Sequence, residues 1–132
     1  MRSSVLDSHA VLAYLLGEKG GRTVEVLLEK ATLARKKVLI AAPNWSEIRY
    51  QVERKLGEAG WEEIRTALLG LPLEIVAADQ KLAETAGRIK ATRRMSLADC
   101  FAAGLAIERK ADVYTGDPEF REVEKEVRIV WI

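Results

Sequence analysis

Four carboxylates are the residues of this sequence whose type and position could support hydrolytic chemistry: Asp7, Glu47, Asp99 and Asp117. Asp7 follows a short apolar stretch, and each of the others stands near the expected start of a helix. If the four side chains converge, their mutual repulsion calls for a cation, and oxygen-only ligands suit Mg²⁺ or Mn²⁺. Such an ion can activate a water and stabilise charge on a phosphate during an in-line displacement.

Each acid also has an ordinary structural explanation. Asp7 can cap the helix after it, and Asp117, which precedes a proline, has the pattern of an N-cap. Asp99 stands three residues after Ser96, as in a capping box, and Glu47 is expected in a first helical turn, where the helix dipole favours an acid. The residue pattern alone leaves both explanations open for every one of the four.

Other catalytic chemistry finds less support in the sequence. Ser8 and His9 are neighbours, and neighbours on a helix do not face each other, so a Ser-His-Asp triad is disfavoured. Cys100 stands among apolar residues and is expected in the core. With one cysteine and one histidine in the whole chain, a zinc site is also disfavoured.

Short apolar stretches alternate with helical patterns along the chain. Five strands are expected, at residues 3–6, 38–41, 73–76, 112–114 and 127–131. Helices are expected at residues 10–16, 22–34, 80–92 and 97–110, with a short one after residue 117. Between the second and third strands we expect one helix from residue 43, with Trp45, Ile48, Val52 and Leu56 on its buried face. A turn at 57–60 should then separate it from another helix that ends at residue 69.

This alternation indicates an α/β fold, because parallel strands need crossover helices that cover both faces of the sheet. Ligands of such sheets bind at the carboxyl edge of the strands. Asp7 leaves the first strand there, and Asp117 follows the 112–114 strand. The length of 132 residues is that of one domain, and we expect residues 1–132 to form a single domain.

The composition indicates where in the cell the protein is expected and how it could contact RNA. Hydrophobic residues make up 48% of the chain, and no stretch approaches the roughly 20 apolar residues of a membrane helix, so no membrane association is expected. The single cysteine favours a reducing, cytoplasmic location. The formal net charge of +1 means that any contact with RNA must come from local basic clusters.

Four short motifs resemble those of PIN-domain ribonucleases, particularly the VapC-type toxins of bacterial and archaeal toxin–antitoxin pairs. They occur in the family's order and span nearly the whole chain: Val5-Leu6-Asp7-Ser8, Ser46-Glu47-Ile48, Ser96-Leu97-Ala98-Asp99-Cys100 and Thr115-Gly116-Asp117.

The resemblance implies a three-layer α/β/α fold with a central parallel sheet of about five strands. It also implies Mg²⁺- or Mn²⁺-dependent endonucleolytic cleavage of RNA by a metal-activated water. The metal-site and catalytic acids would be Asp7, Glu47, Asp99 and Asp117, and the hydroxyls of Ser8 and Thr115 would orient carboxylates or the attacking water. The implied partners are a second copy of the chain, in a homodimer, and a VapB-type antitoxin that blocks the acidic pocket.

Arg93 and Arg94 lead into the Asp99 segment and could hold RNA phosphates, although a solvated helix face explains them equally well. Two alternatives to the toxin remain. One is a PIN-domain RNA-processing nuclease without an antitoxin, and the other is a non-catalytic α/β signalling or interaction module. The second is disfavoured because the acids are spread over four segments, whereas a phosphoacceptor domain gathers them around its first strand.

Overall fold

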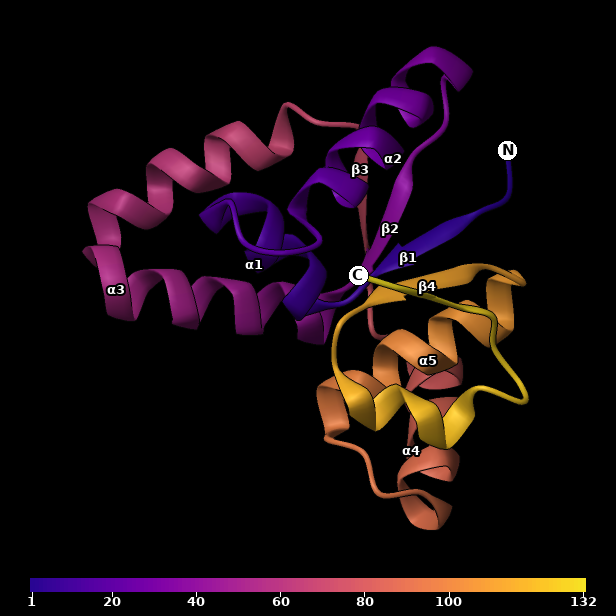
Figure 1. The fold of residues 1–132 in the computed structure, drawn as a ribbon. Coiled ribbons are helices and arrows are strands. Elements are labelled where there is room, and N and C mark those ends of the chain that lie inside the picture. The colour runs from indigo at the N-terminus through magenta and orange to yellow at the C-terminus, as the bar shows by residue number, and fades with distance from the viewer.

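Strand β1 (Ser4–Leu6) lies at the centre of a five-stranded sheet in the computed structural model, which describes all residues 1–132 (Figure 1). The strand order is β3-β2-β1-β4-β5, and every neighbouring pair is parallel. The predicted α/β class with a parallel five-stranded sheet is therefore confirmed. The remaining strands are β2 (Val38–Ala41), β3 (Leu73–Val76), β4 (Asp112–Thr115) and β5 (Ile129–Trp131).

Helices connect the strands and form the two outer layers. They are α1 (Ser8–Leu16), α2 (Gly21–Ala34), α3 (Ala42–Leu69), α4 (Gln80–Thr92), α5 (Leu97–Arg109) and the 3₁₀ helix η1 (Pro118–Val123). In Figure 1, α1 and α2 lie on one side of the sheet and α4 and α5 on the other. No helix combines the length and the apolar composition that crossing a bilayer requires.

Successive side chains of a strand point to opposite faces, and this alternation builds two separate cores. On one face, Val5 and Val113 pack with residues of α4, α5 and η1. On the other face, Leu6 and Ile40 pack with residues of α1, α2 and α3. Because both faces are covered, the strands are apolar on both sides, as buried parallel strands generally are.

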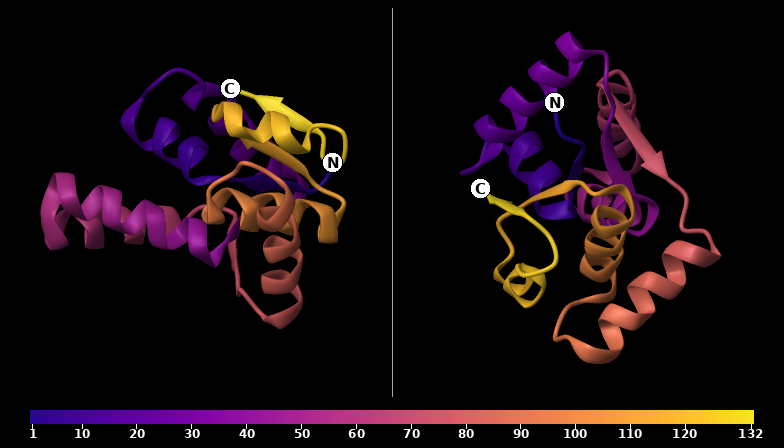
Figure 2. Two further views of the ribbon diagram at one scale, coloured as in Figure 1. Left: turned by 90° about the horizontal axis from the view of Figure 1, so that it is seen from below. Right: turned by 90° about the vertical axis from the view of Figure 1, so that its right-hand side faces the viewer.

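The segment between β2 and β3 differs from the expectation. Instead of a turn at residues 57–60 between two helices, helical structure runs from Ala42 to Leu69 and is broken only at Gly57. Gly57 has φ 73° and ψ 178°, a conformation that a residue without Cβ adopts easily. At this kink α3 turns back on itself as two arms (Figure 1), which project beyond the sheet (Figure 2, left).

One residue of the expected buried face of α3 is also placed differently. Ile48 and Val52 are buried, but Leu56 is 55% exposed because it lies directly before the kink, where α3 has passed beyond the sheet. At the other end of the chain, the last strand begins at Ile129 rather than at Val127, which belongs to the core beneath η1.

The order of the strands brings the end of β1, the end of β4 and the start of α5 to one edge of the sheet. From β1 the chain crosses to β2 on one side, whereas β4 pairs with β1 on the other side, so the crossovers diverge between β1 and β4. Sheets of this kind bind ligands at such a switch point, outside the carboxyl ends of the strands. Helix α5 also begins at this edge, because it must run back to the opposite edge before β4 can start parallel to β1.

Candidate active site

Asp7 stands at the carboxyl end of β1 and is 1% exposed. It is the N-cap of α1, because its Oδ1 accepts a hydrogen bond of 2.8 Å from the backbone N–H of Ala10. Its other oxygen, Oδ2, accepts a short hydrogen bond from the hydroxyl of Thr115. Burial raises the pKa of Asp7 to about 6, although both hydrogen bonds favour the charged carboxylate and act in the opposite direction. The helix cap and the site acid are thus one residue.

Asp99 lies in the first turn of α5, whose N-cap is Ser96. The Ser96 hydroxyl accepts a hydrogen bond of 3.3 Å from the Asp99 N–H. The reciprocal half of a capping box is not formed, since the Ser96 N–H donates to Glu119 at 2.7 Å. Burial is the largest cause that raises the pKa of Asp99, and together with the adjacent carboxylates of Asp117 and Asp7 it brings the pKa to about 8.

Asp117 follows β4 and is the N-cap of η1. Its Oδ1 accepts a hydrogen bond of 2.9 Å from the Glu119 N–H, and its own N–H donates to the Thr115 hydroxyl at 2.9 Å. The Thr115 hydroxyl therefore links Asp7 and Asp117, since it donates to the first and accepts from the second. This places the ends of β1 and β4 in a fixed relation.

Glu47 comes from α3 and is half-buried. Because α3 begins at Ala42, Glu47 lies in the second helical turn and not in the first, as the sequence had suggested. Its Oε2 accepts long hydrogen bonds of 3.4 Å from the Tyr50 hydroxyl and from Gln51 Nε2. It therefore lies outside the reach of the helix dipole, and its position has no capping explanation.

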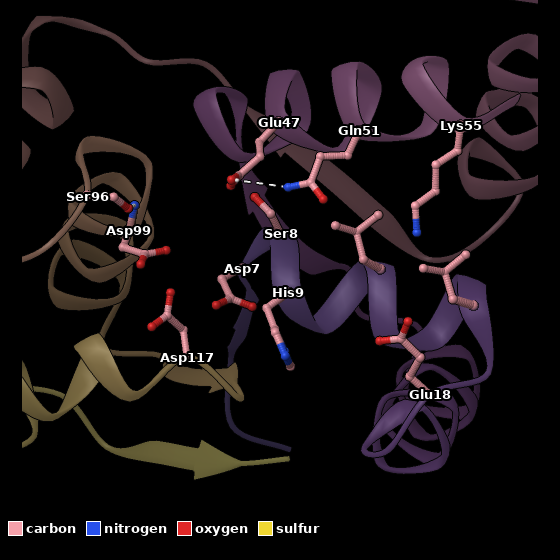
Figure 3. A pocket seen from close by; sticks show the side chains of 12 residues that line it. Asp7, Ser8, His9, Glu18, Glu47, Gln51, Lys55, Ser96, Asp99 and Asp117 are labelled. Carbon is pink, nitrogen blue, oxygen red and sulfur yellow. Dashed lines mark hydrogen bonds between the residues drawn. The ribbon is translucent and has the colours of Figure 1, made fainter. Parts of the chain in front are cut away.

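All four predicted acids line one pocket of about 310 Å³ (Figure 3). In the figure, Asp99 and Asp117 approach from one side, Asp7 lies between them and His9, and Glu47 extends from α3 above. The complete lining comprises Asp7, Ser8, His9, Leu12, Leu16, Glu18, Glu47, Gln51, Lys55, Ser96, Asp99 and Asp117.

Glu119 belongs to the same group of acids and was missed in the sequence. One oxygen each of Asp99, Asp117 and Glu119 lie within 4.8 Å of one another, so these three side chains could together hold a metal ion. The spacing gives no signal for it, because side chains that share a face of a 3₁₀ helix are three residues apart, whereas Glu119 is only two residues after Asp117. Glu119 also joins η1 to the start of α5 through the Ser96 N–H.

The two hydroxyls that were expected to orient carboxylates have different surroundings. Thr115 contacts Asp7, as described above. Ser8 lines the pocket, but its hydroxyl donates to the carbonyl oxygen of Asn44 at 3.3 Å and accepts from the Asn44 side chain. Ser8 thus joins α1 to α3 and makes no hydrogen bond to any of the four acids.

Arg93 and Arg94 do not line the acidic pocket. Arg93 forms an ion pair with Glu126 and donates to the carbonyl oxygen of Glu122, so that it attaches the end of α4 to η1 and to the segment after it. The Arg94 backbone N–H donates to the Glu122 carboxylate at 3.1 Å, while its residue is exposed. RNA contacts by these arginines stay a prediction.

The remaining polar candidates are accounted for by the fold. Cys100 is fully buried in the core formed with α4 and α5. Asp112 lies at the start of β4, at the opposite edge of the sheet, where Arg2 and Arg128 pair with it at 2.8 Å and 3.5 Å. His9 is exposed at the pocket, and its ring packs so closely on Gly116 that a Cβ there would overlap it.

The donor set fits a hard divalent cation. Every charged donor at the Asp99–Asp117 side of the pocket is a carboxylate, and the cluster has no lysine or arginine within salt-bridge distance. Carboxylate oxygens at this spacing are the ligands that Mg²⁺ and Mn²⁺ prefer. Burial is the main cause of the raised pKa of Asp99, and no positive charge of the protein offsets the additional effect of the Asp117 and Asp7 carboxylates.

Comparisons with known proteins agree with this architecture. No curated protein sequence matches the chain. Among solved structures, a chain of the DNA-bound VapBC complex from Salmonella typhimurium aligns with a TM-score of 0.73 and 22% identity, with 98% of each chain covered. The VapBC2 complex from Rickettsia felis, bound to a promoter DNA fragment, gives a TM-score of 0.72 and 17% identity, again with 98% of each chain covered.

A third structure is VapC20 from Mycobacterium tuberculosis, described as a toxin that cleaves the sarcin-ricin loop. It aligns with a TM-score of 0.66 and 18% identity over 90% of this chain and 93% of its own. At these identities the likeness establishes a shared fold. The sequence itself matches the family model of the PIN domain over residues 4–126, which is nearly its whole length. The chain therefore belongs to the PIN domain family.

Proposed function

We propose that this protein is a Mg²⁺- or Mn²⁺-dependent endoribonuclease in which Asp7, Glu47, Asp99 and Asp117 form the metal site. The observation that carries the proposal is that these acids, from four separate segments of the chain, line one pocket at the switch point of the sheet. Membership of the PIN domain family and the sarcin-ricin loop cleavage described for VapC20 support RNA as the substrate.

In this mechanism the protein's own groups arrange charge around the scissile phosphate. Asp99 and Asp117, together with Asp7 and Glu47, would hold the ion. When bound, the ion supplies positive charge for the phosphate and a more acidic water. Thr115 keeps Asp7 and Asp117 in a fixed relation through its hydroxyl. Asp99, whose pKa is about 8 without a cation, must release its proton when the ion binds.

We further propose that the enzyme is a VapC-type toxin, a cytoplasmic homodimer held inactive by a VapB-type antitoxin. Support comes from the fold shared with chains of the Salmonella typhimurium and Rickettsia felis VapBC complexes. An open reading frame for a small DNA-binding protein directly upstream is the genomic signature of such a pair. Its absence would favour an RNA-processing nuclease of the same family.

The test is an RNA cleavage assay with the purified protein, in Mg²⁺, in Mn²⁺ and with a chelator. Cleavage is expected only with a divalent ion, and Asp99→Asn should abolish it. Asp112→Asn is the matched control, because it removes a buried carboxylate at the opposite edge of the sheet. Cleavage that persists in the chelator overturns the mechanism, and equal loss in both variants would show that loss of folding, not of the site, is responsible.

A further inference from the structure

Helix α3 carries a row of polar side chains that leads away from the acids. Glu47, Gln51 and Lys55 are four residues apart and therefore lie on one helix face, and all three line the acidic pocket (Figure 3). Eight residues of helix separate Glu47 from Lys55 by about 12 Å along the axis. The row thus extends from the proposed metal site to the far end of the same pocket.

Lys55 is the only lysine or arginine in the lining of this pocket, which otherwise contains five acids. Its ammonium group is exposed and forms no hydrogen bond or ion pair with the protein. Glu18 faces the same end of the pocket in Figure 3 but is beyond salt-bridge distance. The positive charge is therefore available to an external anion.

Apolar surface adjoins this lysine. Leu12 and Leu16 of α1 line both the acidic pocket and a neighbouring apolar groove between α1 and α3, and Gln51 and Lys55 belong to both linings as well. Leu16, the last residue of α1, is 44% exposed. Next to the free cation there is thus a strip of leucine surface that nothing in the chain covers.

We propose that Lys55, with Leu12 and Leu16, forms a subsite for a nucleotide that flanks the scissile phosphate. This inference rests on the proposed ribonuclease function. A strand whose scissile phosphate lies at the acids must continue along the pocket, and only the Lys55 end offers it positive charge. The ammonium binds a flanking phosphate, which positions the strand. The leucines contact the apolar face of the ribose or base, and the Gln51 side chain offers an amide for hydrogen bonds between Lys55 and the acids.

The experiment compares Lys55→Met with Lys81→Met. Both replace an exposed lysine on a helix by an uncharged side chain of similar length, but Lys81 lies on α4, on the other face of the sheet. For cleavage of a single-stranded RNA in Mg²⁺, Lys55→Met should raise KM several-fold and leave kcat near the wild-type value. The slope of log affinity against log salt should become shallower by about 0.7, the contribution of one phosphate contact on a single strand.

Leu16→Asn tests the apolar half of the subsite. It should raise KM without changing the salt slope, because it removes no charge. If Lys55→Met matches Lys81→Met in both KM and salt slope, the phosphate contact is disproved, and an unchanged KM in Leu16→Asn disproves the leucine contact. A wild-type protein that neither binds nor cuts RNA overturns the proposed function itself, whereas active variants without these effects overturn only the subsite.

Discussion

Asp99 and Asp117 place carboxylate oxygens within 4.8 Å of each other, although one begins helix α5 and the other follows strand β4. Two negative charges at this distance repel strongly where water is partly excluded. Together with burial, this repulsion raises the pKa of Asp99 to about 8, so the metal-free protein keeps a proton on this group at neutral pH. The same geometry gives the site an energetic reason to bind a cation.

Asp99→Asn should therefore separate activity from stability. The amide carries no charge, so it removes a proposed metal ligand and also removes the cost of keeping the group protonated while the unfolded chain ionises. Cleavage should fall by more than ~100-fold, while the melting temperature at pH 7–8 without metal should rise above that of the wild type. Wild-type cleavage by the variant would disprove the metal site, and a large loss of melting temperature would indicate a structural role instead.

The pH dependence of stability provides a second prediction. A carboxyl group whose pKa is raised in the folded state contributes most stability below its unfolded value of 3.8, and this contribution is lost as the pH rises to the folded value. The stabilising contribution of Asp7 is lost by about pH 6, and that of Asp99 by about pH 8. Between pH 6 and 8 the metal-free wild type should lose melting temperature, and Asp99→Asn should show a smaller loss.

Divalent ions should reverse this trend. Because the ligands must be deprotonated before the ion binds, Mg²⁺ or Mn²⁺ at a fixed concentration, ten times its dissociation constant at pH 8, should stabilise the protein by about 1.4 kcal/mol at pH 8 and by less at pH 6. Thermal melts at pH 6 and pH 8, each with and without metal, measure the difference. An ion effect that is equal at both pH values, or equally large in Asp99→Asn, would contradict the assignment.

Thr115→Val tests the hydroxyl that joins Asp7 to Asp117. Valine has nearly the same shape but can neither donate to Asp7 nor accept from the Asp117 N–H. Leaving buried polar groups without partners should cost about 1–3 kcal/mol of stability, and cleavage should fall by ~10- to 100-fold. Thr115→Ser keeps the hydroxyl and should retain most of the activity. Equal activity of the two variants would show that the hydroxyl does not position the acids.

Asp112→Asn should give the opposite result to Asp99→Asn. Asp112 is about as buried as Asp7 and Asp99, but Arg2 and Arg128 compensate its charge at the amino edge of the sheet. Its neutralisation should lower the free energy of unfolding by about 1–3 kcal/mol and leave the rate of RNA cleavage unchanged in a protein that is still folded. Loss of cleavage without loss of folding would mean that the site extends further than the pocket described above.

The helix caps show how far the sequence predicts the site. Asp7, Ser96 and Asp117 were all recognisable as N-caps, and in the structure the side chain of each accepts a hydrogen bond from a helix N–H. A cap can be read from sequence because its hydrogen bond is local, spanning two or three residues. Gly57 was less predictable, since one residue in a left-handed conformation bends a helix that the local pattern divided at a longer turn.

By itself the sequence determined the alternation of strands and helices, the caps and, through its motifs, the family resemblance. Only the tertiary structure decided that Asp99 and Glu119 lie against Asp117, that Ser8 bonds to Asn44, and that Arg93 pairs with Glu126. The physical reason is strand order: placing β4 beside β1 brings the ends of both strands and the start of α5 to one edge. The periodicity of apolar residues in the sequence indicates which face of a helix or strand is buried, but not which helices and strands become neighbours.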